Sequence, residues 1–296
     1  MWDILACSYC GHELQRTQSG AECHQCGTRY EFTDSGSLDL RLKKRKKYSL
    51  EFDIDTRSLP DDGFPFEPLR LNPNPEVDFS NVRTPYHLTK EMMSYFPRAR
   101  SPQGSLVLDI GCGDAIHKTT CEHAGFEWIG LDRNPKRDPP ILGDAHALPF
   151  KSNTFEFILS VAALQYIRFP FVMMREVCRV LKPHGRFIGT VAFLEPFHDT
   201  FYHYTHWGVF SMLQYGGFTV QKVAPSERWT VLAAQADMGL FPKMPGFMSR
   251  SIVFPVEILH KLWWRAGGLV TSKASKITRI RNMTGAFTFV ATKGDD

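Results

Sequence analysis

The chain alternates between short apolar runs and polar segments, as an open α/β sheet requires. Residues 105–110, Ser-Leu-Val-Leu-Asp-Ile, form an apolar run that predicts a buried parallel strand. Similar runs predict strands at 127–131, 155–160, 186–192, 217–223 and 285–291. Apolar residues at helical spacing predict helices at 173–181 and 256–264. Together these elements predict an α/β fold.

Composition narrows the class of protein. The 296 residues are 43% hydrophobic and 22% charged, which is enough apolar material for a packed core. A net charge of +4 is too small to indicate nucleic-acid binding by itself. No stretch reaches the ~18 consecutive apolar residues of a membrane-spanning helix. The N-terminus, with Asp3, lacks the basic region of a secretory signal. We therefore expect a soluble, cytoplasmic protein.

Four of the seven cysteines have the spacing of a metal site. Cys7, Cys10, Cys23 and Cys26 form two C-x2-C pairs separated by twelve residues. Two such pairs supply four thiolates for one tetrahedral ion, whereas a pair of disulfides is disfavoured in a reducing cytosol. The spacing therefore predicts structural zinc, with no open position for a catalytic water.

The segment after the cysteines is basic and then rich in proline. Six of the seven residues at 41–47 are Lys or Arg, which fits either contact with phosphates or a solvated linker. Eight prolines between 50 and 102 argue against long elements there. The exception is 86–96, where we expect a short helix between Pro85 and Pro97.

A glycine turn follows the first predicted strand of the main sheet. Asp109-Ile-Gly111-Cys-Gly113 leads into a helix, and the next strand ends at Asp132. Glycines let the backbone approach a nucleotide closely, and a carboxylate about twenty residues later can accept ribose hydroxyls. Asp109 would repel a pyrophosphate but suits a cationic group such as a sulfonium or an ammonium.

These residues, with those that follow, resemble class I S-adenosylmethionine-dependent methyltransferases over about 140 residues. Asp109, Gly111 and Gly113 match the first motif, Asp132 the ribose-binding acid, and Asp144-Ala145 the adenine-contacting pair. The segments after strand four and before strand five also match, at 160–166 and 180–186. Two positions depart from the family pattern. Ala115 stands where a third glycine is common, and Gln165-Tyr166 stands where many relatives have Glu-His.

The resemblance implies a Rossmann-like α/β fold, with a seven-stranded, mostly parallel sheet whose last strand is antiparallel, preceded by the zinc ribbon. It implies S-adenosylmethionine as cofactor. The residues expected to bind it are Asp109, Gly111, Cys112, Gly113, Asp132, Arg133, Asp144, Ala145, Ser160 and Ala162. The expected division of the chain is a zinc ribbon at 1–40, a linker at 41–83, the methyltransferase domain at 84–223 and 284–296, and an insertion at 224–283.

Two regions are candidates for contact with the methyl acceptor. The loop at 195–207 follows strand five, and we favour His198 as a general base, with Asp199 and His203 as alternatives. The insertion at 224–283 is basic and aromatic. We favour a lid or wall over the acceptor. The alternatives are a surface for an anionic polymer or lipid headgroup, and a dimer contact.

The sequence thus predicts a methyltransferase with a small-molecule or glycan acceptor. Two alternatives remain. The ribbon and basic linker resemble the arrangement in bacterial 23S rRNA guanine-N1 methyltransferases, which implies an RNA substrate reached through the ribbon and residues 41–47. The ribbon also resembles the zinc-ribbon activator proteins of methyltransferases, and the third reading is a partner subunit that binds the cofactor without catalysis.

Overall fold

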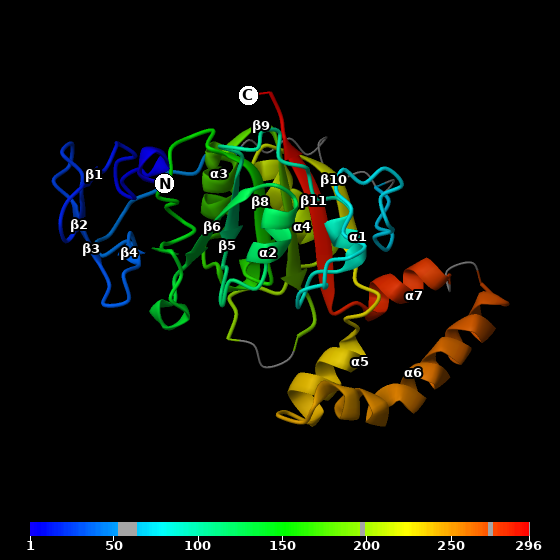
Figure 1. Ribbon diagram of the computed structural model, residues 1–296. Helices are drawn as coiled ribbons and strands as arrows, with labels where there is room; N and C mark the ends of the chain where they lie inside the picture. The colour runs from blue at the N-terminus through cyan, green and yellow to red at the C-terminus, as the bar shows by residue number, and fades with distance from the viewer. Residues whose placement is uncertain (53–63, 196–198, 272–274, 296) are drawn as a thin grey trace.

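The computed structural model describes residues 1–52, 64–195, 199–271 and 275–295. Their strands form one eleven-stranded sheet in the order β1-β2-β3-β4-β7-β6-β5-β8-β9-β11-β10 (Figure 1). The strands are β1 (Gln15–Arg16), β2 (Gly20–Glu22), β3 (Arg29–Phe32), β4 (Leu38–Asp39), β5 (Leu106–Ile110), β6 (Glu127–Asp132), β7 (Ile141–Leu142), β8 (Phe155–Val161), β9 (Leu181–Ala192), β10 (Phe218–Pro225) and β11 (Ala286–Lys293).

Seven of these strands, β7-β6-β5-β8-β9-β11-β10, match the predicted Rossmann-like sheet. Strands β7, β6, β5, β8 and β9 are parallel to their neighbours in this part of the sheet. The last strand, β11, is antiparallel to both β9 and β10. The predicted fold class is therefore confirmed.

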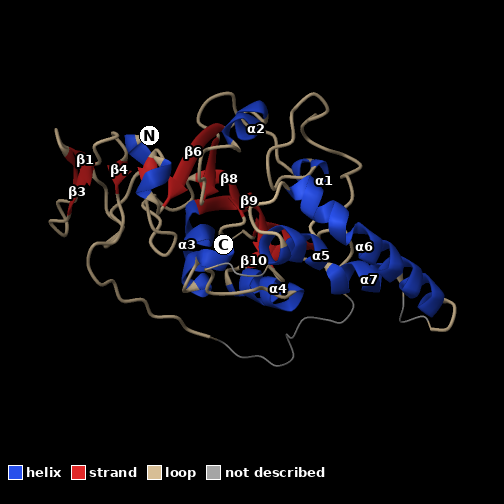
Figure 2. Cartoon of the chain, turned by 90° about the horizontal axis from the view of Figure 1, so that it is seen from below, coloured by secondary structure: helices blue, strands red, loops and turns tan. Residues whose placement is uncertain are grey.

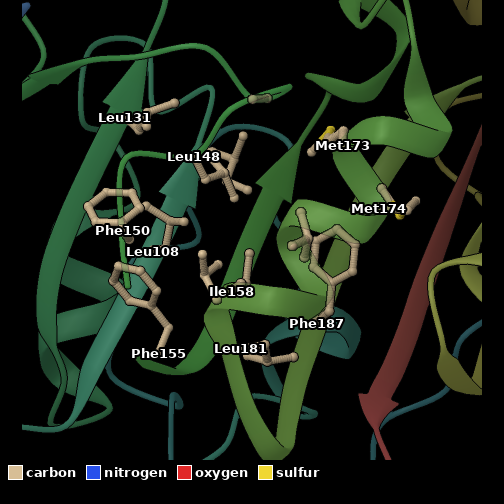
Figure 3. Packing of buried hydrophobic residues seen from close by; sticks show 14 of the residues in the cluster. Leu108, Leu131, Leu148, Phe150, Phe155, Ile158, Met173, Met174, Leu181 and Phe187 are labelled. Carbon is tan, nitrogen blue, oxygen red and sulfur yellow. The ribbon is translucent and has the colours of Figure 1, made fainter. Parts of the chain in front are cut away.

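Helices cover both faces of this sheet (Figure 2). They are α1 (Lys90–Met93), α2 (Lys118–His123), α3 (Pro170–Val180), α4 (His206–Tyr215), α5 (Val231–Ala234), α6 (Gly246–Gly268) and α7 (Lys276–Met283). Side chains alternate along each strand, so Leu108 packs in the cluster of α3 and α4 while Val107 packs in that of α1 and α2. Figure 3 shows the first cluster, where Leu108 lies beside Phe150 and Leu148, and Phe187 lies below Met174 of α3. Among the described residues, no helix is both long enough and apolar enough to cross a membrane.

The ribbon shares its sheet and its core with the rest of the chain. Strand β4 pairs in parallel with β7, and the Leu40 N–H donates to the Leu142 carbonyl over 2.7 Å. The Leu40 carbonyl in turn accepts a hydrogen bond of 2.6 Å from the Ser8 hydroxyl. Leu5 and Leu40 belong to the same buried cluster as Phe150. The metal-binding segment is thus fixed to the edge of the main sheet.

The helix expected at 86–96 is shorter than predicted. Only α1 is helical there, and it begins after Thr89, whose hydroxyl accepts from the Met92 N–H over 3.1 Å. His87 has a positive φ of 65°, a conformation that an α-helix excludes. This backbone bend is what delays the start of the helix.

Removing apolar volume at the junction between ribbon and sheet should destabilise the whole chain. Leu40 is fully buried, so Leu40→Ala should lower the free energy of unfolding by about 2–5 kcal/mol. Leu71→Ala, at a side chain that is 61% exposed, is the control and should change it by less than about 0.5 kcal/mol. Denaturant titration followed by tryptophan fluorescence measures both. Equal stabilities for the two variants would mean that the ribbon folds independently of the sheet.

Candidate functional site

The turn between β5 and α2 is held by the end of β6. The Leu131 carbonyl accepts hydrogen bonds from the N–H groups of Gly111 (2.8 Å) and Cys112 (3.2 Å). A carboxylate oxygen of Asp132 accepts from the Gly113 N–H over 3.0 Å. Gly111 has a φ of +75°, and a Cβ there would lie 2.5 Å from the Cβ of Ala163, so only glycine fits. Ala115 also has a positive φ, of 57°, a conformation that glycine adopts more readily than alanine.

A pocket of about 420 Å³ opens beside this turn. Seven of the predicted cofactor-binding residues line it: Gly111, Gly113, Asp132, Arg133, Asp144, Ala145 and Ala162. A Cβ on Gly113 would meet no atom within 4 Å, so the backbone is open to the pocket there. The other oxygen of Asp132 accepts the Asn134 N–H over 2.8 Å, and each oxygen keeps a lone pair for a further donor. The chemistry of this pocket fits an adenosine ribose.

Asp144 is held in place by a histidine that sequence analysis did not select. A ring nitrogen of His146 lies 2.5 Å from an Asp144 oxygen, and the other accepts the Phe169 N–H over 3.0 Å. Burial alone would raise the pKa of Asp144, but hydrogen bonds from His146 outweigh it and lower that pKa. Asp144 is therefore an anion in a fixed orientation at the pocket wall. The proximity of His146 to Asp144 in the sequence was the available signal.

Three predicted cofactor contacts lie beneath the pocket and do not line it. Asp109 is fully buried, and one of its oxygens lies 3.3 Å from both the His117 and Trp128 ring nitrogens. Cys112 and Ser160 are also buried, and burial raises the pKa of the Cys112 thiol, so it stays neutral. The side chains of these residues support the turn and the strand ends instead of facing the pocket.

A second pocket, of about 440 Å³, adjoins the first and shares Ala162 and Tyr166 with it. We call it the acceptor pocket. Gln165 lines it, is fully buried, and has no hydrogen-bond partner for its side-chain oxygen or nitrogen among the described residues. Glu195, which is 8% exposed, accepts a 2.8 Å hydrogen bond from the Trp229 indole. Two buried polar side chains thus face one cavity.

Two further features define the acceptor pocket. Burial, together with the charges of Glu195 and Asp199, raises the pKa of Tyr166, so its hydroxyl stays protonated. Ala162, between the two pockets, has a positive φ of 53° and its N–H donates to Thr190. Backbone strain of this kind is typical of binding sites. Sequence analysis did not select Gln165, Glu195 or Trp229 as site residues, because only the folded chain brings these three residues to one pocket.

None of the three predicted candidate bases is a described residue of the two pockets. His198 lies outside the described residues. Asp199 and His203 are exposed, and neither is among the described residues that line the two pockets. Thr205, in the same loop, caps α4 by accepting the Gly208 N–H over 3.1 Å.

The four N-terminal cysteines converge on one point. Their sulfur atoms all lie within 4.8 Å of one another, with Cys7–Cys26 at 3.6 Å and Cys10–Cys23 at 3.4 Å. Tetrahedral zinc with bonds of about 2.3 Å requires sulfur separations of about 3.8 Å. The Thr28 hydroxyl, 3.1 Å from Cys26, lowers the pKa of that thiol to about 6, whereas burial raises the pKa of Cys10 and Cys23. The geometry of the four sulfur atoms, and not their pKa values, therefore supports a metal site. The four thiols therefore fit a zinc ion.

Comparison with known proteins gives one family match, to a methyltransferase domain over residues 108–189. The chain is 28% identical over 130 residues to a demethylmenaquinone methyltransferase of Renibacterium salmoninarum, covering 37% of this chain and 55% of that protein. It is 35% identical over 97 residues to a mitochondrial arginine-hydroxylase of Danio rerio, covering 29% and 30%. The chain therefore spans at most about half the length of these relatives.

A solved complex between a Haloferax volcanii methyltransferase activator and a methyltransferase is also similar. The matched chain of that complex is 16% identical in sequence, with a TM-score of 0.46. The match covers 74% of this chain and 92% of that chain.

Neutralising the acid at the end of β6 should weaken cofactor binding. We expect Asp132→Asn to bind S-adenosylhomocysteine about tenfold to a hundredfold more weakly, because charged hydrogen bonds to two hydroxyls are lost. Glu127→Gln, at the exposed start of the same strand, is the matched control and should bind normally. Calorimetric titration measures both affinities. An unchanged affinity for Asp132→Asn would place the ribose elsewhere.

Removing one thiol should release the metal. The purified protein should hold one zinc ion per chain, and Cys23→Ser should hold none, because structural zinc needs four ligands. Loss of zinc should also lower the melting temperature of the whole chain, since the ribbon and the sheet share a core. Cys178→Ser, far from the cluster in sequence and on α3, is the control. Elemental analysis that finds zinc in Cys23→Ser would contradict the assignment.

Proposed function

We propose that this chain, whose residues 108–189 form a class I S-adenosylmethionine-dependent methyltransferase domain, methylates a small-molecule or glycan acceptor. The observation that carries the proposal is the meeting of two pockets at Ala162 and Tyr166. One has the residues for the cofactor, and the other has buried polar groups for an acceptor. A nucleophile in the acceptor pocket would therefore face the cofactor pocket.

The pocket beside the glycine turn, which we call the cofactor pocket, binds the cofactor and orients it. Asp132 accepts the two ribose hydroxyls, while the open backbone at Gly113 lets the ligand approach the turn. Asp144, fixed by His146, and Ala145 form the wall for the adenine. When bound, S-adenosylmethionine supplies a sulfonium methyl group that an acceptor lone pair attacks, while the carbon–sulfur bonding pair stays on sulfur.

The acceptor pocket positions the nucleophile and receives its proton. Glu195 takes the proton that an acceptor hydroxyl or amine loses, and its hydrogen bond from Trp229 fixes the carboxylate. Gln165 offers both a donor and an acceptor to a polar group of the substrate. Alignment of the nucleophile with the methyl group supplies much of the rate. We therefore prefer Glu195 to Asp199 and His203 as the base, because Glu195 lines the pocket and is buried.

The basic linker favours a small acceptor over RNA. Arg41 and Lys43 are paired with Asp39, at 2.9 and 3.8 Å, and the Lys46 ammonium donates to the Ser8 carbonyl over 2.6 Å. Three of the six cations at 41–47 are thus engaged within the protein. An RNA-binding surface uses such cations for phosphates.

The base assignment predicts a loss of turnover without a loss of cofactor binding. Glu195→Gln keeps the shape and a hydrogen-bonding oxygen but cannot take a proton, so we expect methyl transfer to fall by about 10²–10⁴-fold. Asp199→Asn, nearby but exposed, is the control and should change it little. Affinity for S-adenosylhomocysteine should be unchanged in both. Full activity of Glu195→Gln would exclude Glu195 as the base.

The acceptor class is identified by the fraction of a cell extract that takes up a labelled methyl group. Wild-type protein and methyl-labelled S-adenosylmethionine are incubated with the small-molecule, glycan, RNA and protein fractions of a cell extract. We expect label in the small-molecule or glycan fraction. Label in RNA would instead support the rRNA alternative. Cofactor binding with no labelled product in any fraction would support the partner-subunit reading.

A further inference from the structure

The insertion between β10 and β11 ends in a helix that leaves the body of the protein. Its first part, with α5, Trp229 and Asp237, borders the acceptor pocket. The 23-residue α6 then extends away from the sheet (Figures 1 and 2). At its N-terminal end, Ser249 and Arg250 both bind the Asp237 carboxylate. Only Ser249 is buried among the residues of α6.

One side of α6 exposes a continuous apolar surface. Met248, Ile252, Val256, Leu259 and Trp263 recur at intervals of three or four residues and so lie on one side of the helix. The exposed fraction reaches 66% at Leu259 and 77% at Trp263. Ile258 and Leu262 widen this surface, and Leu269 and Val270 extend it past the end of the helix. We call these nine residues the apolar face. Phe247 and Phe254 are also exposed, but they lie on the side of the helix that carries Arg250.

Single exposed apolar side chains are ordinary, but a contiguous surface of this kind is typical of an interaction site. The apolar face is also wider than the narrow seam of a coiled coil, because it includes Ile258 and Leu262 as well as the regular stripe. Its side chains are mainly aliphatic, whereas single-stranded RNA is bound by stacking on aromatic rings. These properties favour a broad, fluid apolar partner.

Positive charge is concentrated beside the apolar face. Arg250, Lys261 and Arg265 recur along another side of α6. Arg250 is paired with Asp237 and Lys261 with Glu257. The segment 241–283 contains eight Lys or Arg and one Glu, a net charge of +7. Because the whole chain has a net charge of +4, the residues outside this segment sum to −3. Two copies packed through this segment would bring like charges together, so a second copy is a poor occupant.

We propose that α6 docks on the surface of an anionic lipid bilayer. The apolar face enters the boundary between headgroups and acyl chains. Arg265 and the cations of α7 (Lys276, Arg279 and Arg281) contact lipid phosphates. This is peripheral binding, in keeping with the absence, among the described residues, of a helix able to cross a membrane. Because Arg250 lines a smaller cavity that shares Glu195 and Trp229 with the acceptor pocket, docking would hold the site close to the bilayer.

The test is sedimentation with lipid vesicles, using the full chain saturated with S-adenosylhomocysteine. We expect binding to vesicles that contain phosphatidylglycerol, at least tenfold weaker binding to pure phosphatidylcholine, and further weakening in high salt. The double variant L259D/W263D should lose at least tenfold in vesicle affinity, because two apolar anchors become anions. Both side chains are exposed, so the fold should be kept.

Two controls make the outcome decisive. Leu71→Asp places one such charge at a comparably exposed apolar residue outside α6 and should bind vesicles like wild type, while Leu259→Asp alone, with the same single charge, should bind them more weakly. Cofactor binding is measured for each variant, so that failure of docking is separate from failure of the proposed catalytic function. Equal binding of L259D/W263D and wild type, or no binding to anionic vesicles, would overturn the proposal. A wild-type dimer that this double variant dissociates, without vesicle binding, would assign the apolar face to a second copy.

Discussion

The hydrogen bonds between the end of β6 and the turn after β5 are the constraint on which the site depends. Three consecutive N–H groups, from Gly111 to Gly113, are bound by Leu131 and Asp132. They fix the turn in a backbone conformation that glycine adopts without strain. The same contacts set the Asp132 carboxylate at the mouth of the cofactor pocket before any ligand arrives. Preorganisation of this kind lowers the entropic cost of binding.

Segments outside the matched domain complete the site from the two ends of the sheet. At one end, the ribbon and its linker lie against the wall formed by Asp144 and His146, and the Tyr48 hydroxyl donates to the His146 carbonyl. At the other, the insertion brings Trp229 to Glu195. The family match covers residues 108–189, so the acceptor pocket combines Gln165 and Tyr166 of the matched domain with Glu195 and Trp229 from outside it.

Local patterns were predictable from the sequence, and long-range contacts were not. The C-x2-C pairs and the strand–glycine turn–strand order are readable because their geometry depends on neighbouring residues. The pairing of β4 with β7 is not, because both strands have two residues and join segments as distant as Ser37 and Asp138, 101 residues apart. Glu195 gave no signal because its hydrogen bond with Trp229 joins residues 34 positions apart. The burial of Asp109 against His117 and Trp128 was equally unreadable, because both contacts come from other elements of the fold.

The central claim is that this chain holds one S-adenosylmethionine-type cofactor in the pocket beside Gly111 and Gly113. A crystal structure with S-adenosylhomocysteine tests it most directly, since it shows both the presence and the position of the ligand. The account predicts one molecule per chain, with its ribose hydroxyls on Asp132 and its adenine beside Ala145. A ligand bound in another place, or none at saturating concentration, would contradict it.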